Sequence, residues 1–406
     1  MTSTLNVAII GGGASGLFLA NLLQVDKVAL FERGDRLGKK LSATGNGQGN
    51  ISNISCTKEG YFSFTARGKA LAQTLVSAYD DKVLKEFFES LGVLLIADER
   101  GRIYPAGRQA SALTDALRFQ LQRKGVQTHL STKVFAVTKE NELFRLQTDK
   151  GDFYAKTVAI CTGGKSAKNF GTDGFSYALA QSFSHTLTPL YPALVQIKTD
   201  TKDIKTLKGI RVSPACITAS WTEEGKSVSR QEEGDILFTE YGVSGDAIFR
   251  LSAFITDKIE RGVKLSVNFL PQFSVEEIYS VLQKKRQTQK DTPFGELLCG
   301  IVNNQVGRAV AKIVGQEDLF ALATTVQNFP LTVSGSLGFD YAQVTKGGVN
   351  AEEVEDTLES KCQKDLYFAG EILDIDGKCG GYNLQWAFAS AKAIATAIDK
   401  KYEGQV

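Results

Sequence analysis

A glycine-rich turn between an apolar run and a helical pattern is the feature that most restricts the fold of this chain. Residues 5–10 read LNVAII, a β-branched run typical of a buried strand, and residues 11–16 follow with the spacing G-x-G-x-x-G. Apolar residues then recur at helical intervals as far as Leu23, and a second apolar run at 27–31 ends on Glu32. This order of strand, turn, helix and strand predicts a βαβ unit.

Each of the three spaced glycines of that turn has a separate physical role in a dinucleotide site. Gly11 permits the tight turn, Gly13 leaves room for a pyrophosphate, and Gly16 lets the helix pack closely on the strand. Free N–H groups at the helix start would face the phosphates. Glu32 can accept both hydrogen bonds of an adenosine ribose and would repel a 2′-phosphate. A G-x-G-x-x-G alone also fits a plain βα connection, but its place after a strand and the distance to the acid favour dinucleotide binding.

Length, charge and cysteine usage limit the remaining possibilities. A chain of 406 residues is expected to form two or three packed units. Its 47 basic and 45 acidic residues leave a formal charge of +2, so no net field favours a nucleic-acid partner. The apolar run at 5–10 is too short to span a bilayer, and we expect no membrane insertion. The cysteines are scattered singly, without the close pairs of metal sites or redox disulfides: Cys56, Cys161, Cys216, Cys299, Cys362 and Cys379. We therefore expect a reduced, cytoplasmic protein without a metal.

Two further segments favour FAD over NAD. Residues 33–50 are rich in small residues, amides and cations, and such a loop can lie along a phosphate and ribityl chain. Near the other end, the strand-like DLYFA at 365–369 is followed by Gly370, Glu371 and Asp374, then by a glycine pair and the helical pattern at 384–397. The acid would bind a ribityl hydroxyl, and the start of the helix near Asn383 would stabilise the negative charge of a reduced flavin.

The chain also resembles a known family. Its motifs are similar, in the same order, to those of the bacterial flavoproteins that include aminoacetone oxidases and BaiN-like reductases: GGGASG, GKKLSATGNGQGNISN, ICTGGKS, LFTEYGVSG, VTKGGV and YFAGEILDIDGKCGGYNLQWAFAS. The resemblance covers nearly the whole chain and implies FAD and an α/β fold of the two-dinucleotide-binding type. In that fold a Rossmann domain is built from both chain ends. The family commonly has Arg-Cys at Gln48-Gly49, and His and Pro at Glu240 and Asp246, so chemistry that needs a thiol in the first loop is in doubt.

Motif and resemblance together define an expected cofactor site and an expected domain plan. We expect the FAD domain to comprise residues 1–187 and 336–406. A β-rich substrate domain is expected at residues 188–240 and 320–335, and a helical insertion is expected at residues 241–319. A helix is also expected at 172–183. The residues expected to hold FAD are Gly11, Gly13, Ala14, Ser15, Gly16, Glu32, Arg33, Lys40, Ser42, Gly45, Asn46, Gly49, Asn50, Val134, Thr162, Gly163, Gly370, Glu371, Gly381, Asn383 and Leu384.

The reaction is less constrained than the cofactor. Only one G-x-G-x-x-G occurs, which favours a flavoenzyme that oxidises a substrate and uses molecular oxygen. We expect an oxidase of a small primary amine such as aminoacetone, which yields a carbonyl product, ammonia and hydrogen peroxide. The alternatives are an NAD(P)H-dependent reductase of an activated C=C bond, as in BaiN-like proteins, and a redox sensor without catalysis. The oligomeric state is left open.

Candidate substrate-positioning residues are aromatic, because an aromatic cage suits a small cationic amine. The four candidates for a catalytic role are Tyr382, Cys379, Tyr191 and Tyr241. For Tyr382 core packing is an equally good interpretation, and Cys379 also fits a small apolar filler. The two histidines, His129 and His185, are expected to be structural.

Overall fold

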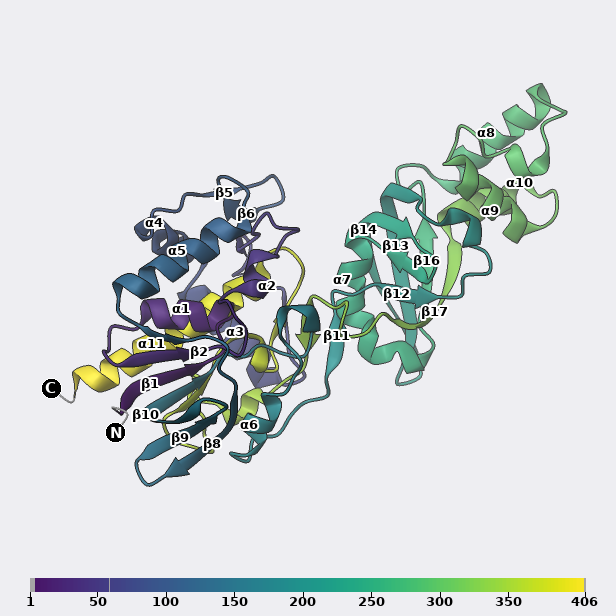
Figure 1. Cartoon of the computed structure of the whole chain (residues 1–406). Coiled ribbons are helices and arrows are strands. Elements are labelled where there is room, and N and C mark those ends of the chain that lie inside the picture. Colours follow the sequence, from purple (N-terminus) through teal and green to yellow (C-terminus); the bar gives the residue numbers. More distant parts are fainter. Residues whose placement is uncertain (1–3, 58, 405–406) are drawn as a thin grey trace. The chain divides into compact units, whose positions relative to one another are not determined.

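The computed structural model describes residues 4–57 and 59–404, and the chain divides into two compact units. One unit comprises Met1–Tyr191 and Val344–Val406, and the other comprises Pro192–Gln343. Each unit has its own buried hydrophobic core. In Figure 1 the first unit contains both the purple N-terminal and the yellow C-terminal segments. The chain therefore leaves the first unit once and returns to complete it.

A seven-stranded sheet forms the centre of the first unit. Its order is β7-β2-β1-β10-β9-β8, and β19 also pairs with β10. Four strand pairs are parallel: β1 with β2, β1 with β10, β2 with β7 and β10 with β19. Strand β9 pairs antiparallel with both β8 and β10. The strands are β1 Leu5–Ile10, β2 Val28–Phe31, β7 Gln127–His129, β8 Val134–Glu140, β9 Leu143–Thr148, β10 Gly151–Ile160 and β19 Leu366–Phe368. β2 and β19 are buried along their whole length, as expected for strands covered on both faces.

Helices from both chain ends cover this sheet. α1 and α11 pack against each other, so the first and last long helices of the chain are neighbours (Figure 1). The helices of the unit are α1 Ala14–Leu22, α2 Lys39–Ser42, α3 Ala66–Ala78, α4 Asp81–Ser90, α5 Ala110–Arg123, α6 Tyr177–Gln181 and α11 Tyr382–Glu403. Its smaller sheets contain β3 Ser52–Asn53, β6 Arg102–Pro105 and β5 Leu95–Ala97, and β20 Asp376–Gly377 with β4 Tyr61–Phe62. The short strands β11 Tyr191–Ala193 and β18 Val344–Lys346 lie where the chain passes between the units.

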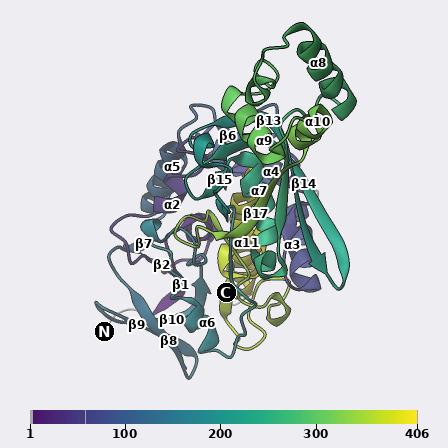
Figure 2. The same ribbon diagram turned by 90° about the vertical axis from the view of Figure 1, so that its right-hand side faces the viewer.

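The second unit is built on a closed barrel. Its strands follow one another in the order β12 Ile197–Thr199, β15 Gly242–Ser244, β14 Lys226–Phe238, β13 Arg211–Glu223, β16 Lys264–Asn268 and β17 Phe329–Ser336. Ala215, Ile217 and Ala219 alternate with more exposed residues along β13, so one face of this strand lines the core. α7 Asp246–Ile255 packs on β14. The helices α8 Val275–Thr288, α9 Asn304–Val314 and α10 Leu319–Gln327 lie together at one end of the unit in both Figure 1 and Figure 2.

Three expectations about local structure need correction. The helix expected at 172–183 is limited to α6, because the left-handed glycines Gly171 and Gly174 interrupt the preceding segment. Strands β15 and β16 belong to the barrel although a helical insertion was expected throughout residues 241–319. Residues 297–303, which were expected to be helical, form turns, and α9 begins only after Asn303, whose side chain accepts the N–H of Gln305.

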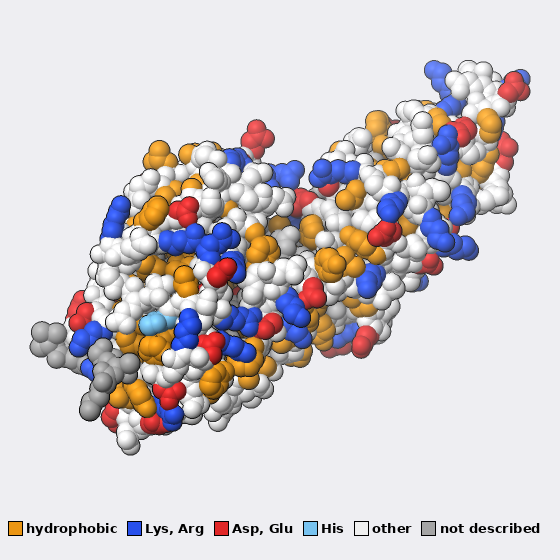
Figure 3. All heavy atoms as spheres, viewed as in Figure 1, with side chains coloured by type: hydrophobic (Ala, Val, Ile, Leu, Met, Phe, Trp, Pro, Cys, Tyr) orange, Lys and Arg blue, Asp and Glu red, His pale blue; other side chains and the backbone are white. Residues whose placement is uncertain are grey.

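Surface charge agrees with the balanced composition. Basic and acidic side chains both occur over the visible face of the molecule in Figure 3. The lysine-rich stretch after residue 283 lies on α8, where Ile278 and Leu282 are buried and Lys284 is exposed. Within the described residues, no helix combines the length and apolar composition that crossing a membrane requires.

Candidate functional site

The glycine turn between β1 and α1 has the geometry of a phosphate-binding turn. Gly11 has a φ of +107°, and a Cβ there would lie 2.6 Å from the carbonyl oxygen of Cys161. A Cβ on Gly16 would lie 1.9 Å from the oxygen of Gly11, so the close packing of helix and turn excludes any side chain. A Cβ on Gly13 would meet no atom within 4 Å. It would project into open space at the start of α1, where Gly13 provides no side-chain cap.

Glu32 is held in place by the backbone on both sides of the turn. Its Oε2 accepts the N–H of Gly12 at 2.8 Å, and its Oε1 accepts the N–H of Gly34 at 2.7 Å. These bonds fix the carboxylate at the end of β2 while each oxygen keeps a second lone pair. The geometry thus suits the ribose contact expected from the sequence. Arg33, next to it, pairs with Asp173 at 2.9 Å and also contacts the carbonyl oxygen of Gly171.

The loop after β2 is shaped by left-handed backbone. Gly45 and Asn46 have φ values of +58° and +55°, and a Cβ on Gly49, with φ of +78°, would lie 2.9 Å from the Cα of Ala110. Asn50 Nδ2 donates to the carbonyl oxygens of Ser52 and Ile103 at 3.1 Å each. Asn50 therefore stabilises the loop itself.

Ser42 also has a local partner. Its hydroxyl lies 3.0 Å from the carbonyl oxygen of Gly38 and 2.9 Å from Thr114 Oγ1. In this structure it ties the short helix α2 to α5.

Three sequence motifs that are distant along the chain meet around Thr345. Its Oγ1 accepts the backbone N–H groups of Lys165 and Ser166 at 2.8 and 3.0 Å, and its own N–H donates to Glu371 Oε1 at 2.9 Å. Glu371 Oε2 in turn lies 2.9 Å from Lys40 Nζ. The loop after β2, the loop after β10 and the acid after β19 therefore form one hydrogen-bonded assembly.

The start of α11 is positioned by glycines and by Asn383. Gly381 has a φ of +100°, and a Cβ there would lie 2.2 Å from the carbonyl oxygen of Ser52. The Asn383 amide accepts from the N–H of Gly377 at 2.8 Å and donates to its carbonyl oxygen at 2.6 Å. Leu384 follows on the same helix. Nearby, Gly370 donates its N–H to Ser390 Oγ at 3.0 Å, so α11 is locked to the segment that carries Glu371.

The residues present fit an FAD molecule. Thr162 Oγ1 is buried and has no hydrogen-bond partner among the described residues, beside the left-handed Gly163 with φ of +71°. Gly13 leaves the open cradle described above, which a Cβ would fill. Ser15 Oγ lies 3.5 Å from the carbonyl oxygen of Cys161, next to Ala14 at the start of α1.

Val134, expected at the adenine, is buried at the start of β8. No contact in the structure tests that expectation, and it stays a prediction.

The four candidates for a catalytic role have different surroundings in the structure. Tyr382 is 2% exposed, and its hydroxyl donates to the carbonyl oxygen of Ser55 at 3.1 Å, so it packs in the core. Cys379 and Tyr191 are partly buried. Tyr241 belongs to the second unit, where its carbonyl oxygen accepts the N–H of Thr199. The aromatic-cage hypothesis therefore gains no support from the geometry of either unit.

Asp374 is a residue to which the sequence assigned no role. It is fully buried, and its Oδ2 accepts from Ser63 Oγ at 2.9 Å and from the N–H of Phe64 at 3.0 Å. Burial raises the pKa of this carboxyl to about 6, although these hydrogen bonds and the charge of Lys346 act in the opposite direction. The only sequence signal was an acid inside the C-terminal glycine-rich motif.

Comparisons with known proteins identify the family of the chain. The family profile of the HI0933-like protein Rossmann domain matches residues 5–397. The chain is 33% identical to a 3-dehydro-bile acid delta(4,6)-reductase of Clostridium scindens, over 97% of this chain and 99% of that protein. It is 29% identical to a ribosomal RNA dihydrouridine synthase of Haemophilus influenzae, over 97% of this chain and 98% of that protein.

A solved structure shows the same fold at low sequence identity. The 3-ketosteroid-delta4-(5alpha)-dehydrogenase of Rhodococcus jostii RHA1 aligns with a TM-score of 0.51 and 13% identity, over 98% of this chain and 97% of that chain. The Rossmann-type FAD fold expected from the sequence, with an additional β-rich domain, is confirmed. The chain thus belongs to the HI0933-like family, whose members are FAD-dependent oxidoreductases.

Proposed function

We propose that this protein is an FAD-dependent reductase of a carbon–carbon double bond conjugated to a carbonyl group, with NAD(P)H as the electron donor. The observation that carries the proposal is the match, over nearly the full length of both chains, to a protein named as a bile-acid reductase. The dihydrouridine synthase relative supports the same reaction class, because dihydrouridine is uridine with its ring double bond saturated next to a carbonyl.

Saturation of such a bond consumes a hydride and a proton. FAD, when bound, supplies the hydride. The chain itself must supply or relay the proton, and Asp374 is the buried acid best suited to hold one on a carboxyl oxygen. Its pKa of about 6 is closer to neutrality than that of an exposed aspartate, and Ser63 donates a hydrogen bond to the same carboxyl.

Oxidation of a small primary amine is the alternative function. The single G-x-G-x-x-G favours it, since the chain contains no second motif of this kind for a pyridine nucleotide. The relatives named above do not include an amine oxidase, and the hydroxyl of Tyr382, one of the tyrosines of the expected cage, binds the backbone of Ser55. We therefore rank this function second.

Anaerobic mixing of the FAD-loaded protein separates the two functions. We expect NADH or NADPH to bleach the flavin absorbance rapidly, and 2-cyclohexen-1-one or a steroid 4-en-3-one to restore it. Bleaching by aminoacetone but not by either nucleotide, with hydrogen peroxide formed on admission of air, would overturn the proposal in favour of the oxidase.

The same experiment addresses the class of substrate. If ribosomal RNA that contains uridine reoxidises the reduced flavin and no small enone does so, the proposed reaction class is retained. The substrate is then RNA and not a small molecule. The formal charge of +2 provides no strong attraction for RNA, so we expect the small molecule to be the better substrate.

A further inference from the structure

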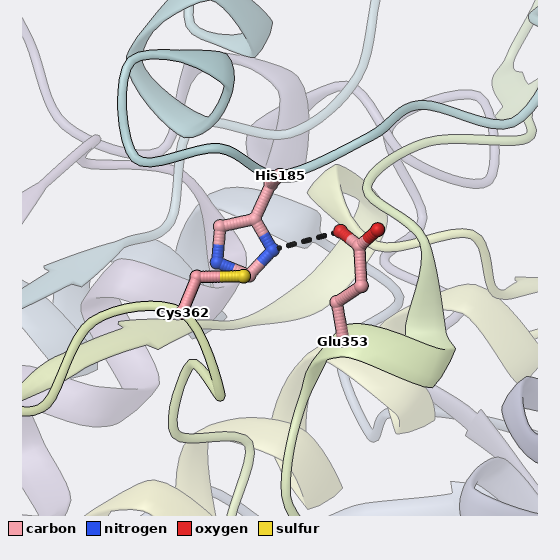
Figure 4. Close-up of side chains that lie close together, drawn as sticks. All are labelled: His185, Glu353 and Cys362. Atoms are coloured by element: carbon pink, nitrogen blue, oxygen red, sulfur yellow. Dashed lines mark hydrogen bonds and ion pairs between the residues drawn. The ribbon is translucent and has the colours of Figure 1, made fainter.

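Three side chains with metal-binding chemistry meet in the first unit, outside the set of residues that holds FAD. His185 follows α6, Glu353 ends the short 3-10 helix Ala351–Glu353, and Cys362 lies in the loop before β19. One potential ligand atom from each of them lies within 4.8 Å of the other two (Figure 4). Their sequence positions show no metal-ligand spacing, so only the fold brings them together.

The distances in this cluster are close to those of a tetrahedral site. His185 Nδ1 lies 3.2 Å from Glu353 Oε2. Two ligands of a tetrahedral Zn²⁺ ion with bonds of about 2.0 to 2.1 Å are separated by about 3.3 Å, so this edge is already formed. Cys362 is exposed, and rotation of its side chain can bring the sulfur closer without disturbing the core. An exposed cysteine also leaves space for water as a fourth ligand.

The surroundings of His185 orient the imidazole as a ligand. Its side chain is buried, and Ser360 Oγ lies 2.6 Å from Nε2, which leaves Nδ1 facing Glu353. Glu353 is fixed as well, since its Oε2 accepts the N–H of Thr186 at 2.8 Å. A hydrogen bond to the second ring nitrogen is the usual outer-shell support of a metal-bound histidine.

The local charge favours a cation over a free thiolate. A carboxylate oxygen of Glu353 lies within 4.8 Å of Cys362 Sγ and gives the cluster a negative potential. The same negative potential would attract a divalent ion. A set of one nitrogen, one sulfur and one oxygen ligand suits Zn²⁺ or Co²⁺ and does not suit Mg²⁺ or Ca²⁺, which prefer oxygen alone.

We propose that His185 Nδ1, Glu353 Oε2 and Cys362 Sγ bind one Zn²⁺ ion, with water completing the tetrahedron. Binding releases the thiol proton of Cys362 and moves the proton of the neutral imidazole from Nδ1, which faces Glu353, to Nε2, which faces Ser360 Oγ. The ion would link Cys362, in the segment before β19, to His185, in the segment after α6. This site is independent of the proposed reaction.

Cobalt titration of the FAD-loaded protein tests the site, because tetrahedral Co²⁺ with a thiolate ligand absorbs in the red, where oxidised flavin does not. The wild type is expected to develop this absorbance at one Co²⁺ per chain and to lose it when Zn²⁺ is added. Cys362→Ala should weaken binding by about tenfold or more. The matched control is Cys299→Ala: Cys299 Sγ also contacts a carboxylate, Glu296 Oε2 at 2.8 Å, but belongs to no three-residue cluster in the described part of the chain.

A second measurement gives the same answer without any colour change. Zn²⁺ should slow the alkylation of Cys362 by iodoacetamide, mapped by mass spectrometry, and leave the alkylation of Cys299 unchanged. No cobalt absorbance in the wild type, equal binding by Cys362→Ala, or alkylation of Cys362 that ignores Zn²⁺ would each overturn the proposal.

Discussion

Lys40 Nζ and Glu371 Oε2 lie 2.9 Å apart although 331 residues separate them in the sequence. Lys40 belongs to the short helix α2 after β2, and Glu371 follows β19 at the other end of the chain. Both side chains are partly buried, with exposed fractions of 27% and 18%. The pair therefore joins two segments that are expected to hold FAD, and it forms only after both ends of the chain have folded together.

Replacement of Lys40 by Met should weaken FAD binding by about tenfold, because it removes a cation expected beside the cofactor and leaves Glu371 Oε2 without its ion-pair partner. The loss of unfolding free energy should be modest, about 1 kcal/mol, since the pair is only partly buried. A double-mutant cycle with Glu371→Gln, measured by FAD titration, should show coupling between the two residues. Strictly additive effects would contradict the role of this pair.

Gly13 and Gly16 should respond differently to replacement by alanine. Gly13→Ala places its methyl group in open space, and the backbone at φ of −76° accepts alanine, so stability should be nearly unchanged while FAD affinity falls by at least about tenfold. Gly16→Ala sets its Cβ 1.9 Å from the Gly11 oxygen and should destabilise the fold by about 3 kcal/mol or more. Urea unfolding and FAD titration of both variants test this contrast, which equal stability losses would refute.

Glu32→Gln probes the ribose contact. The amide can replace only one of the two carboxylate oxygens that now accept the N–H groups of Gly12 and Gly34, and its NH₂ faces the other donor. We expect FAD affinity to fall by about tenfold to a hundredfold, as for the loss of charge-assisted hydrogen bonds. The exposed Glu142→Gln serves as the control and should bind FAD like the wild type. Retention of full affinity by Glu32→Gln would exclude the ribose contact.

The fold of the first unit could be predicted because it depends on local backbone requirements that the sequence records directly. β1 coincides with the LNVAII run, and Gly11, Gly16 and Gly381 occupy positions that admit no Cβ. The barrel boundaries were less predictable, because β16 is a five-residue strand between helical segments and its partners β13 and β17 are distant in sequence.

The chemistry of individual side chains was harder to predict, because it depends on burial and on contacts between distant segments. Tyr382 stands inside the flavin motif, yet its hydroxyl binds the backbone of Ser55. Asp374 acquires its raised pKa from burial, and its hydrogen-bond partner Ser63 is 311 positions away in the sequence. Neither property has a signature in residue spacing.

Asp374 should give the stability of the protein an unusual pH dependence. Its pKa is raised in the fold from 3.8 to about 6, mainly by burial, so the folded state binds the proton more tightly than the unfolded chain. The contribution of this group to the free energy of unfolding is therefore fully present below pH 3.8. That contribution is lost as the pH rises through about 6. The shift corresponds to about 3 kcal/mol between these limits.

Urea unfolding of wild type and Asp374→Asn across this pH range measures the effect. The difference in unfolding free energy between the variant and the wild type should increase as the pH rises from about 4 to about 7, because the amide never ionises in the buried site. Asp98→Asn should show no such increase over this range, because any change at Asp98 falls below pH 3.8. The pKa of Asp98 is lowered despite its burial, through the hydrogen bonds and charge of Arg102, so its carboxylate stabilises the fold at neutral pH and loses that effect on acidification. If the two variants instead follow the same pH trend, the Asp374 carboxyl is ionised as easily as a surface aspartate, and the case for it as the proton-holding group of the reductase fails with it.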